Sequence, residues 1–573
     1  METSYLVGAI GVGFRQFQNH MPIKFPAFEQ PPPGHRDWYL FEAVRSVPRI
    51  LLMLDRNPLS PTYGCFDREY WHYRTADFPC GMNEEFCLVL ALAWATEHPQ
   101  NPFFHNPRLR EFVEAALRFA KKSAHRDGSC DDYFPFERAR GATAFSLYAM
   151  TESYQVLDLK DESLLSFFAR RAGWLLKHQE SGRLANHQAL TALALQNTHT
   201  LTGERRLRDG MEELRALALS WQNGEGWFQE YEGADPGYQT CSLSFLAKLR
   251  QRTGEASLTE PLLRAVRFAA HFMHPDGSYA GEYGSRNTYH FYPHGVELLA
   301  RESPEALWMA ELFLRKGMPR RTRYFNDDDR MCAHYVYDWF QAWRDYADVL
   351  GRKDAQYPTE PQTAWFPAAG LLVERDARRC AVAAAHKGGV IKVTDESGPI
   401  YSDTGPMVQF ADGTVLVAHL TNPANRVNWD ASGRALTIEG HLCRRRVPLM
   451  TPLKQIGFRL LALTVGRWNS NWLRRLVQKL FITGKPATKA TFARTIRFAE
   501  DVIEITDAID LHGASRPKAV IAAPESTSIY VAGSNSFQAS NLLPVRRLDQ
   551  LLAALQSNGS GSETFSLKFP PAS

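Results

Sequence analysis

The pattern of hydrophobic and polar positions changes character near residue 350. Between Asn83 and Leu350, apolar residues recur at intervals of three and four, which is the period of a helix with one buried face. Beyond residue 367, apolar residues come in short alternating runs bounded by Gly, Asp and Asn, which is typical of strands. The pattern predicts a multidomain protein in which a helical domain precedes an antiparallel β-sandwich domain.

The individual elements can be placed from this periodicity. Helices are expected at Asn83–Thr96, Leu109–Ser123, Ala142–Leu157, Glu162–His178, Ala189–Thr200, Gly210–Trp221, Cys241–Arg252, Leu262–His274, Leu298–Lys316 and Cys332–Leu350. Strands are expected in the runs CAVAAAH, GVIKVTD, TVLVAHL, ALTIEG, TFARTIRFA, VIEITDAI and AVIAAP.

Four loops rich in Gly, acids and aromatics interrupt the helical part. Counted from Gly128, Gly182, Gly224 and Gly277, they lie 54, 42 and 53 residues apart. A spacing near 50 suits one helical hairpin with its turns, and such self-similarity indicates a repeat architecture. If consecutive hairpins close into an (α/α) toroid, these loops fall at one end of it. That end is the predicted site.

The composition shifts suggest domain boundaries. Residues 1–75 are expected to form an extension packed on the toroid, 76–350 the toroid itself, and 351–367 a polar, proline-bearing linker. The β-sandwich is expected over 368–560, and 561–573 reads as a flexible tail.

An insertion at 452–482 is helical, apolar and basic. Two interpretations are open. The helix packs on the sheet with its basic residues outward, or it contacts an anionic membrane surface.

Overall composition narrows the class of protein. With 44% hydrophobic and 22% charged residues, the 573-residue chain has the composition of a soluble globular protein. A net charge of +4, without a basic stripe interleaved with aromatics, argues against nucleic-acid binding. No apolar run is long enough for a membrane-spanning helix.

Cysteines and the N-terminus bear on the compartment. The eight cysteines are scattered without a CxxC pair, which argues against a disulfide scaffold. The apolar run Tyr5–Phe14 is broken by three glycines and lacks a basic leader, so we expect no signal peptide. A bacterial-type cytoplasmic protein is the expectation, or a periplasmic one if the true start lies upstream.

The candidate chemistry lies in the loops. Asn186 and His187 stand at the mouth of an apolar helix, and Tyr238 follows in the next loop. Each has an ordinary structural explanation, as a helix cap or a core side chain. Gathered at one end of a toroid, they predict a catalytic cleft. The expected substrate-binding residues are Glu230, Tyr231, Glu282, Arg286, Asn287, Tyr289, His290 and His294.

The chain resembles the heparinase II/III-like and oligoalginate polysaccharide lyases in three features. These are an Asn-His pair, a Tyr about 50 residues later in an EG…GYQ loop, and a β-rich domain after the helices. The resemblance implies β-elimination on an acidic, uronic-acid polysaccharide or oligosaccharide, with no cofactor required for the chemistry. It implies that Asn186, aided by Arg286, binds the substrate carboxylate. His187 or Tyr238 would be the base, and Tyr238 the acid.

The same resemblance implies a structural zinc ion held by His386, Asp403 and His419 in the β domain. Three such ligands with a fourth position would suit zinc. However, Lys387 beside His386 is unfavourable for a dication. A sheet stabilised without metal is the alternative.

Three other functions remain open at this stage. A toroid glycoside hydrolase would need two carboxylates, for which Glu230, Asp235 and Glu282 are candidates. A uronate C5-epimerase would use the same proton abstraction without cleaving the chain. A non-catalytic polysaccharide-binding or exopolysaccharide-biosynthesis protein would keep the cleft alone.

Overall fold

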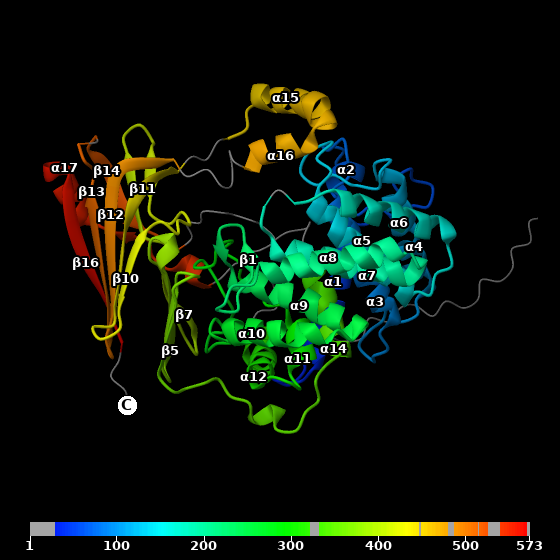
Figure 1. The fold of residues 1–573 in the computed structure, drawn as a ribbon, viewed down its shortest axis with the longest axis horizontal. Coiled ribbons are helices and arrows are strands. Elements are labelled where there is room, and N and C mark those ends of the chain that lie inside the picture. Colours follow the sequence, from blue (N-terminus) through cyan, green and yellow to red (C-terminus); the bar gives the residue numbers. More distant parts are fainter. Residues whose placement is uncertain are drawn as a thin grey trace, which may run out of the picture.

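The computed structural model describes residues 29–180, 182–320, 332–445, 449–478, 486–513, 515–524 and 539–569. Helices fill most of the chain before residue 350, and antiparallel strands fill most of the rest (Figure 1). The predicted order of an α domain followed by a β domain is confirmed. The Tyr5–Phe14 run, considered above for a signal peptide, lies outside the described residues.

Helices of the α domain form a closed double ring. Six of the described helices make an inner ring, each packed on the next. The ring is closed because α14, the last of the six, also contacts α3, the first. The inner helices are α3 (Phe86–Ala95), α5 (Arg140–Val156), α7 (Ala185–Thr202), α9 (Pro236–Thr253), α11 (Pro293–Leu299) and α14 (Ala333–Arg344). The outer helices are α1 (Asp37–Met53), α4 (Pro107–Ser123), α6 (Glu162–Lys177), α8 (Arg205–Ser220), α10 (Thr259–Ala270) and α12 (Pro304–Leu312).

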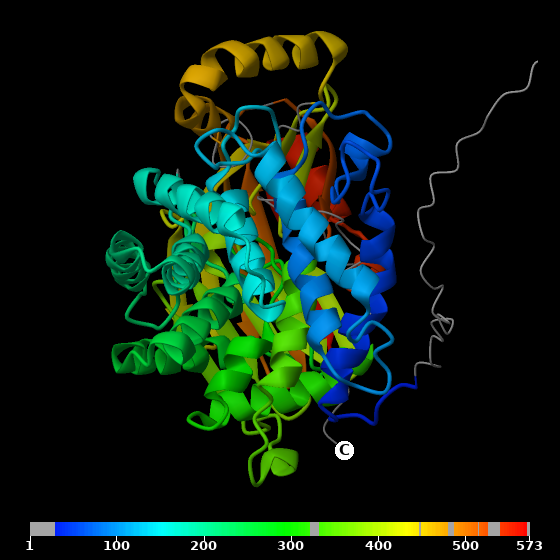
Figure 2. The ribbon, with the colours of Figure 1, turned by 90° about the vertical axis from the view of Figure 1, so that its right-hand side faces the viewer.

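The sequence explains which helices lie inside. Helix α3 reads FCLVLALAWA and buries nearly every residue, as a helix surrounded by protein must. Helix α4 buries one stripe that includes Leu109, Val113 and Leu117 and leaves its charged side to solvent. Figure 2 views this ring from the end opposite the β domain.

The remaining helical segments are short. They are α2 (Arg68–Trp71), the 3₁₀ turns η1 (Gly81–Glu85), η2 (Ala256–Leu258) and η5 (Arg352–Asp354), the π-helical turn η3 (Phe313–Gly317) and α13 (Met318–Arg320). The helix predicted over Leu298–Lys316 is in fact broken, because Ser303 caps a new helix and Pro304 cannot donate a backbone hydrogen bond.

Two antiparallel sheets form the β domain. The five-stranded sheet has the order β3 (Gln362–Phe366), β4 (Leu371–Arg375), β5 (Arg379–Ala384), β6 (Val390–Asp395) and β7 (Gly398–Asp403). The nine-stranded sheet has the order β15 (Arg546–Arg547), β14 (Pro517–Ala522), β8 (Pro406–Phe410), β9 (Val415–Val417), β11 (Ala435–Arg445), β12 (Ala487–Phe498), β13 (Val502–Asp510) and β16 (Ser560–Lys568), with β10 (Arg426–Asp430) paired to β11. Two short helical elements, η10 (Ala539–Leu542) and α17 (Asp549–Asn558), follow β14.

The five-stranded sheet is the middle layer of the molecule. On β4, Leu371 and Val373 join the core of the α domain, whereas Leu372 between them joins the core shared with the nine-stranded sheet. A sheet covered on both faces needs apolar residues at every position. This explains the continuous apolar run from Cys380 to Ala385, in and just after β5. The packing on both faces of this sheet holds the two domains together (Figure 1).

Two of the predicted boundaries differ from the structure. The segment 351–367, expected to be a linker, buries Arg352 against Glu297 and Glu311 and already contains β3. The tail expected from residue 561 is the long strand β16, paired with β13 along its whole length. Its exposed Ser and Thr positions resemble a polar tail in composition, but they are one face of an alternating strand.

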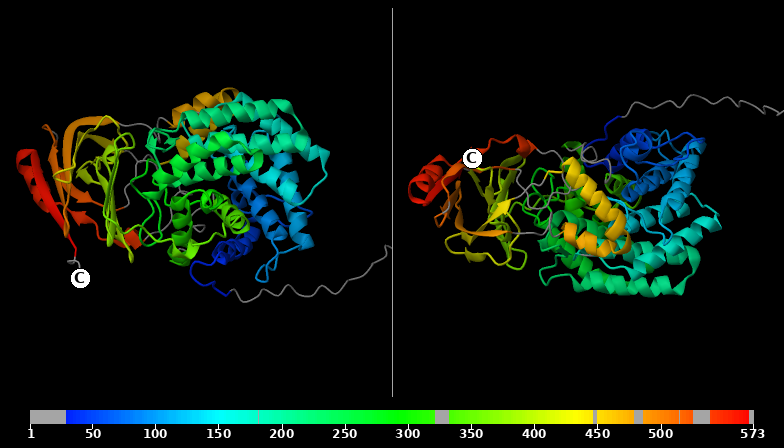
Figure 3. Two further views of the ribbon diagram at one scale, coloured as in Figure 1. Left: turned by 60° about the horizontal axis from the view of Figure 1, so that its bottom comes forward. Right: turned by 90° about the horizontal axis from the view of Figure 1, so that it is seen from above.

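The insertion contains α15 (Pro452–Leu461), the π-helical turn η7 (Ala462–Gly466) and α16 (Ser470–Gln478). This helical hairpin lies over the α domain, as Figures 1 and 3 show. Phe458 packs edge-on against Phe134, and Arg474 donates to the carbonyl oxygens of Glu137 and Arg138. These contacts differ from the predicted packing on the sheet.

Candidate active site

The N-termini of the inner helices α7 and α9 carry the predicted catalytic side chains. Asn186 and His187 lie in the first turn of α7, and Tyr238 lies in the first turn of α9. Asp235 caps α9 by accepting from the backbone N–H of Tyr238 at 3.0 Å, and Pro236 begins the helix. The positive ends of two helix dipoles therefore meet at this site.

Glu230 holds Asn186 in place. Its Oε1 accepts from the backbone N–H of Asn186 at 3.0 Å, and its Oε2 accepts from Asn186 Nδ2 at 2.7 Å. Glu230 comes from the hairpin of β1 (Gln229–Glu230) and β2 (Gly233–Ala234), whose turn residue Tyr231 has a left-handed φ of 54°. Burial raises the pKa of Glu230, and Arg286 and Asn186 oppose that rise.

Arg286 joins Glu230 to Tyr238. Its Nη1 lies 3.1 Å from Glu230 Oε2, and its guanidinium lies 3.6 Å from the ring centroid of Tyr238. Its backbone N–H donates to Asp235 Oδ2 at 2.7 Å. Burial lowers the pKa of Arg286, but the neighbouring Tyr238 and Glu230 outweigh it and raise that pKa above its usual range. Arg286 is therefore a permanent cation against the tyrosine ring.

His187 is oriented by a carboxylate from its own loop. Its Nδ1 lies 2.9 Å from Glu180 Oε2, and Arg474 of the hairpin lies 3.6 Å from Glu180 Oε1. Burial raises the pKa of Glu180, but the bond from His187 and the charges of Arg474 and Arg140 outweigh it, so that pKa is well below its usual range. An ionised Glu180 only accepts, so Nδ1 of His187 carries a hydrogen, and Nε2 is the nitrogen that bears the lone pair in the neutral imidazole.

The sequence did not single out Glu180, Glu85, His334 or Tyr335. His290 stacks on Tyr335 of α14 at 3.8 Å between ring centroids, and His334 beside it lies 3.4 Å from Glu85 Oε2. The sequence held a sign of the pairing of Glu180 with His187, because this acid and this histidine share one short loop. It held none for His334 and Glu85, since His334 lies in an aromatic segment and Glu85 stands beside Asn83 and Glu84 with nothing to single it out.

Three predicted substrate-binding residues face the β domain instead. Glu282 accepts from Ser402 Oγ at 2.9 Å and lies 3.3 Å from Lys392 Nζ, and Lys392 also lies over the Tyr289 ring. Lys387 Nζ donates to Asn287 Oδ1 at 2.7 Å. These residues therefore hold the two domains together over the loop end of the toroid.

Lys387 is a buried amine that donates to uncharged acceptors. Besides Asn287, it donates to the carbonyl oxygens of Glu282 and Gly284 at 2.5 and 2.9 Å. Burial lowers the pKa of Lys387 to about 7, with Asp235 and Glu282 opposing. The residue that counted against a zinc site is thus an interdomain contact.

Stability should therefore depend on pH through Lys387. Its folded pKa of about 7 lies below its unfolded value of about 10.4, so unfolding takes up a proton between these values and the free energy of unfolding rises with pH there. We expect denaturant titrations from pH 7 to 10 to show this rise, at most about 1.4 kcal/mol per pH unit, in wild type but not in Lys387→Met. Parallel pH profiles for the two proteins would contradict it.

His294 lies apart from this cluster. Its Nε2 is 2.7 Å from Asp345 Oδ2, and its backbone N–H donates to Asp338 Oδ2 at 3.0 Å. Burial lowers the pKa of His294 to about 4. These bonds join the start of α11 to α14, which is a structural role.

The three predicted zinc ligands do not gather. Asp403 accepts from Arg494 at 3.1 and 2.8 Å and from Arg546 at 3.0 Å. His419 is fully buried, and burial lowers the pKa of that histidine to about 3. In the part of the chain that the structure describes, no three His, Cys, Asp or Glu side chains form a metal-binding group. Asp403 is neutralised by arginine, so the residues present do not suit a dication.

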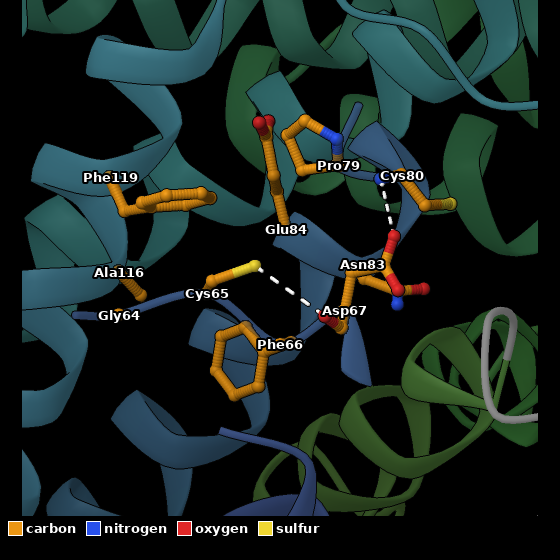
Figure 4. Close-up of a pocket in the computed structure, with 10 residues that line it drawn as sticks. All are labelled: Gly64, Cys65, Phe66, Asp67, Pro79, Cys80, Asn83, Glu84, Ala116 and Phe119. Carbon is orange, nitrogen blue, oxygen red and sulfur yellow. Dashed lines mark hydrogen bonds between the residues drawn. The ribbon is translucent and has the colours of Figure 1, made fainter. Parts of the chain in front are cut away.

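The cluster is closed in this conformation. Asn186, Glu230 and Tyr238 are buried, whereas the His187 side chain is 16% exposed. The separate cavity in Figure 4 lies between Gly64–Asp67, Pro79–Cys80 and α4, and its volume of about 10 Å³ suits one water molecule.

Comparison with known proteins identifies similar folds only. No protein-family model matches the chain, and no curated protein matches its sequence. A Paenibacillus xanthan lyase aligns with a TM-score of 0.48 and 12% identity over 84% of this chain. This chain spans only 46% of that enzyme's length.

Two further solved structures align similarly. The Streptomyces coelicolor A3 chondroitin AC lyase, solved with chondroitin sulphate, gives a TM-score of 0.48 and 13% identity over 85% of this chain and 67% of its own. Heparinase III gives 0.48 and 10% over 85% and 74%. Likeness at this level does not assign an activity, so we argue function from the side chains of the site.

Proposed function

We propose that this protein is a polysaccharide lyase that cleaves a uronic-acid polymer by β-elimination. One observation carries the proposal: the buried series of contacts from Asn186 through Glu230 and Arg286 to Tyr238, beside a histidine whose Nδ1 lies 2.9 Å from Glu180 Oε2. This series supplies a carboxylate-binding amide, a base and an acid, which are the groups that the reaction needs.

The first requirement is to stabilise charge on the uronate carboxylate. The C5 proton beside it is weakly acidic, and its removal places negative charge on the carboxylate oxygens. Asn186 uses one Nδ2 hydrogen on Glu230 and has a second for the substrate. The N-termini of α7 and α9 add positive potential at the same place.

The second requirement is a base. His187 Nε2 removes the C5 proton, and ionised Glu180 stabilises the imidazolium that forms. The His187 side chain is 16% exposed, whereas the other two proposed catalytic residues, Asn186 and Tyr238, are buried.

The third requirement is an acid for the leaving oxygen. The Tyr238 hydroxyl donates its proton to O4 as the C4–O bond breaks, and the electron pair of the C5–H bond forms the C4–C5 double bond. Arg286 against the ring stabilises the phenolate that remains. The products are a new chain end and an unsaturated uronate, and no water is consumed.

Hydrolysis is less well supported by the same geometry. A glycosidase needs two carboxyl groups facing the scissile bond. Glu230 is bonded to Asn186 and Arg286, Asp235 caps α9, and Glu282 is bonded to Ser402 and Lys392. Each of the three candidate carboxylates is thus already used to hold the protein together.

Incubation with a panel of uronate polysaccharides tests the proposal. Ultraviolet absorbance from the unsaturated product should rise together with reducing ends. Reducing ends without absorbance would show hydrolysis. Isomerised uronate at unchanged chain length would show an epimerase. Either result overturns the lyase assignment.

A further inference from the structure

The helical hairpin α15–η7–α16 presents an apolar stripe to solvent. Its side chains are spaced three, four and three residues apart along one side of the first helix, and their exposed fractions are high. They are Leu453 at 82%, Ile456 at 57%, Leu460 at 59% and Leu463 at 43%. Two tryptophans extend it, Trp468 at 90% and Trp472 at 47%. A monomer rarely exposes so many large apolar side chains together.

The hairpin already has a separate inward face. Phe458 packs on Phe134, and Ala462 and Leu473 are fully buried in the same small cluster. At 100° per residue, Phe458 and Ala462 lie on the side of the helix opposite Leu453 and Leu460. The exposed stripe is therefore not needed to fix the hairpin on the α domain, and a helix apolar on both sides is expected to be covered on both.

The charges around the stripe are of one sign. Between Glu439 and Glu500 the sequence has no Asp or Glu. Arg459 pairs with Asp77 of the α domain at 3.2 Å, whereas Lys454 and Arg475 are exposed, as is Arg467, whose guanidinium lies over the Phe136 ring. Leucines and tryptophans flanked by unneutralised cations are complementary to an anionic lipid surface, where rings and aliphatic chains enter the headgroup region.

We propose that α15–η7–α16 docks this protein on an anionic membrane surface. No described helix has the length and apolarity that a bilayer span requires, so the hairpin lies in the plane of the interface. Arg474 joins the hairpin to Glu180, the partner of His187. Docking therefore holds the loop end of the toroid, where the proposed active site lies, close to the lipid.

Co-sedimentation of the full chain with vesicles tests this proposal. We expect binding to phosphatidylcholine vesicles that contain phosphatidylglycerol, weakening as salt rises, and little binding to phosphatidylcholine alone. The double variant Leu453→Glu/Leu460→Glu should lower the vesicle affinity by at least about tenfold. The triple variant Lys454→Glu/Arg467→Glu/Arg475→Glu should lower it by a similar factor.

The matched control makes the same change at exposed leucines elsewhere. Leu59 is 92% exposed and Leu350 fully exposed, and neither belongs to the hairpin. Leu59→Glu/Leu350→Glu should bind like wild type and melt at the same temperature as the hairpin variants. Equal loss in this control, absence of binding, or equal binding to uncharged vesicles would overturn the proposal. So would concentration-dependent self-association abolished by Leu453→Glu/Leu460→Glu without vesicle binding, which would make a second copy the occupant.

Discussion

Replacing Tyr238 by phenylalanine is expected to lower turnover about 10²–10⁴-fold while the protein folds normally. The substitution removes only the hydroxyl that donates the proton to the leaving oxygen. The ring stays buried, and its contact with the Arg286 guanidinium at 3.6 Å is kept. Turnover on the polymer identified in the uronate panel, measured with the melting temperature, checks the result.

Tyr279→Phe is the matched control. Tyr279 is also a buried tyrosine of the toroid loops, but its hydroxyl donates to the carbonyl oxygen of Ala269, outside the cluster. We expect this variant to turn over normally and to lose at most about 1 kcal/mol of stability. Near-normal turnover in Tyr238→Phe would remove Tyr238 from the mechanism and leave His187 to act alone.

Arg494→Met is expected to destabilise the β domain by about 3–5 kcal/mol. Arg494 is fully buried and lies against two buried carboxylates, Asp403 at 2.8 Å and Asp507 at 3.5 Å. Burial raises the pKa of Asp403, but Arg494 outweighs it and holds that pKa well below its usual range. Without Arg494, Arg546 is the one cation among the described residues that pairs with both acids. Denaturant unfolding at neutral pH measures the loss.

The exposed neighbour Arg547 provides the control. It pairs with Asp549 at 3.0 Å, and both side chains are largely exposed, so Arg547→Met should cost about 0–1 kcal/mol. Because arginine rather than a metal neutralises Asp403, a chelator should leave the wild-type melting temperature unchanged. A chelator that destabilises the protein, or an Arg494→Met variant as stable as Arg547→Met, would contradict this account.

Local pattern was sufficient for the elements and for their order along the chain. A period of three to four residues reflects burial of one helix face, and a period of two reflects burial of one strand face, so both can be read without knowledge of contacts. The regular loops before α5, α7, α9 and α11 also follow from the repeat, and the predicted site residues Asn186 and Tyr238 lie in the first turns of α7 and α9.

Patterns failed where a segment is covered by distant parts of the chain. Residues 560–568 have the Ser and Thr content of a tail, yet they pair with β13 through backbone hydrogen bonds, which composition does not report. Lys387 looked like a defect in a metal site, but its acceptors Asn287 and Gly284 lie about 100 residues earlier in sequence.

The sequence by itself determined the α-then-β order, the repeated hairpins and the loops that carry Asn186, His187 and Tyr238, because each depends on spacing within a few turns of chain. Only the tertiary structure decided their partners. The two members of each pair lie 56 residues or more apart in the sequence. The pairs are Glu230 with Arg286, Glu180 with Arg474 and Asp403 with Arg494. Such pairs depend on how the ring closes and where the sheets pack, and no local periodicity encodes that.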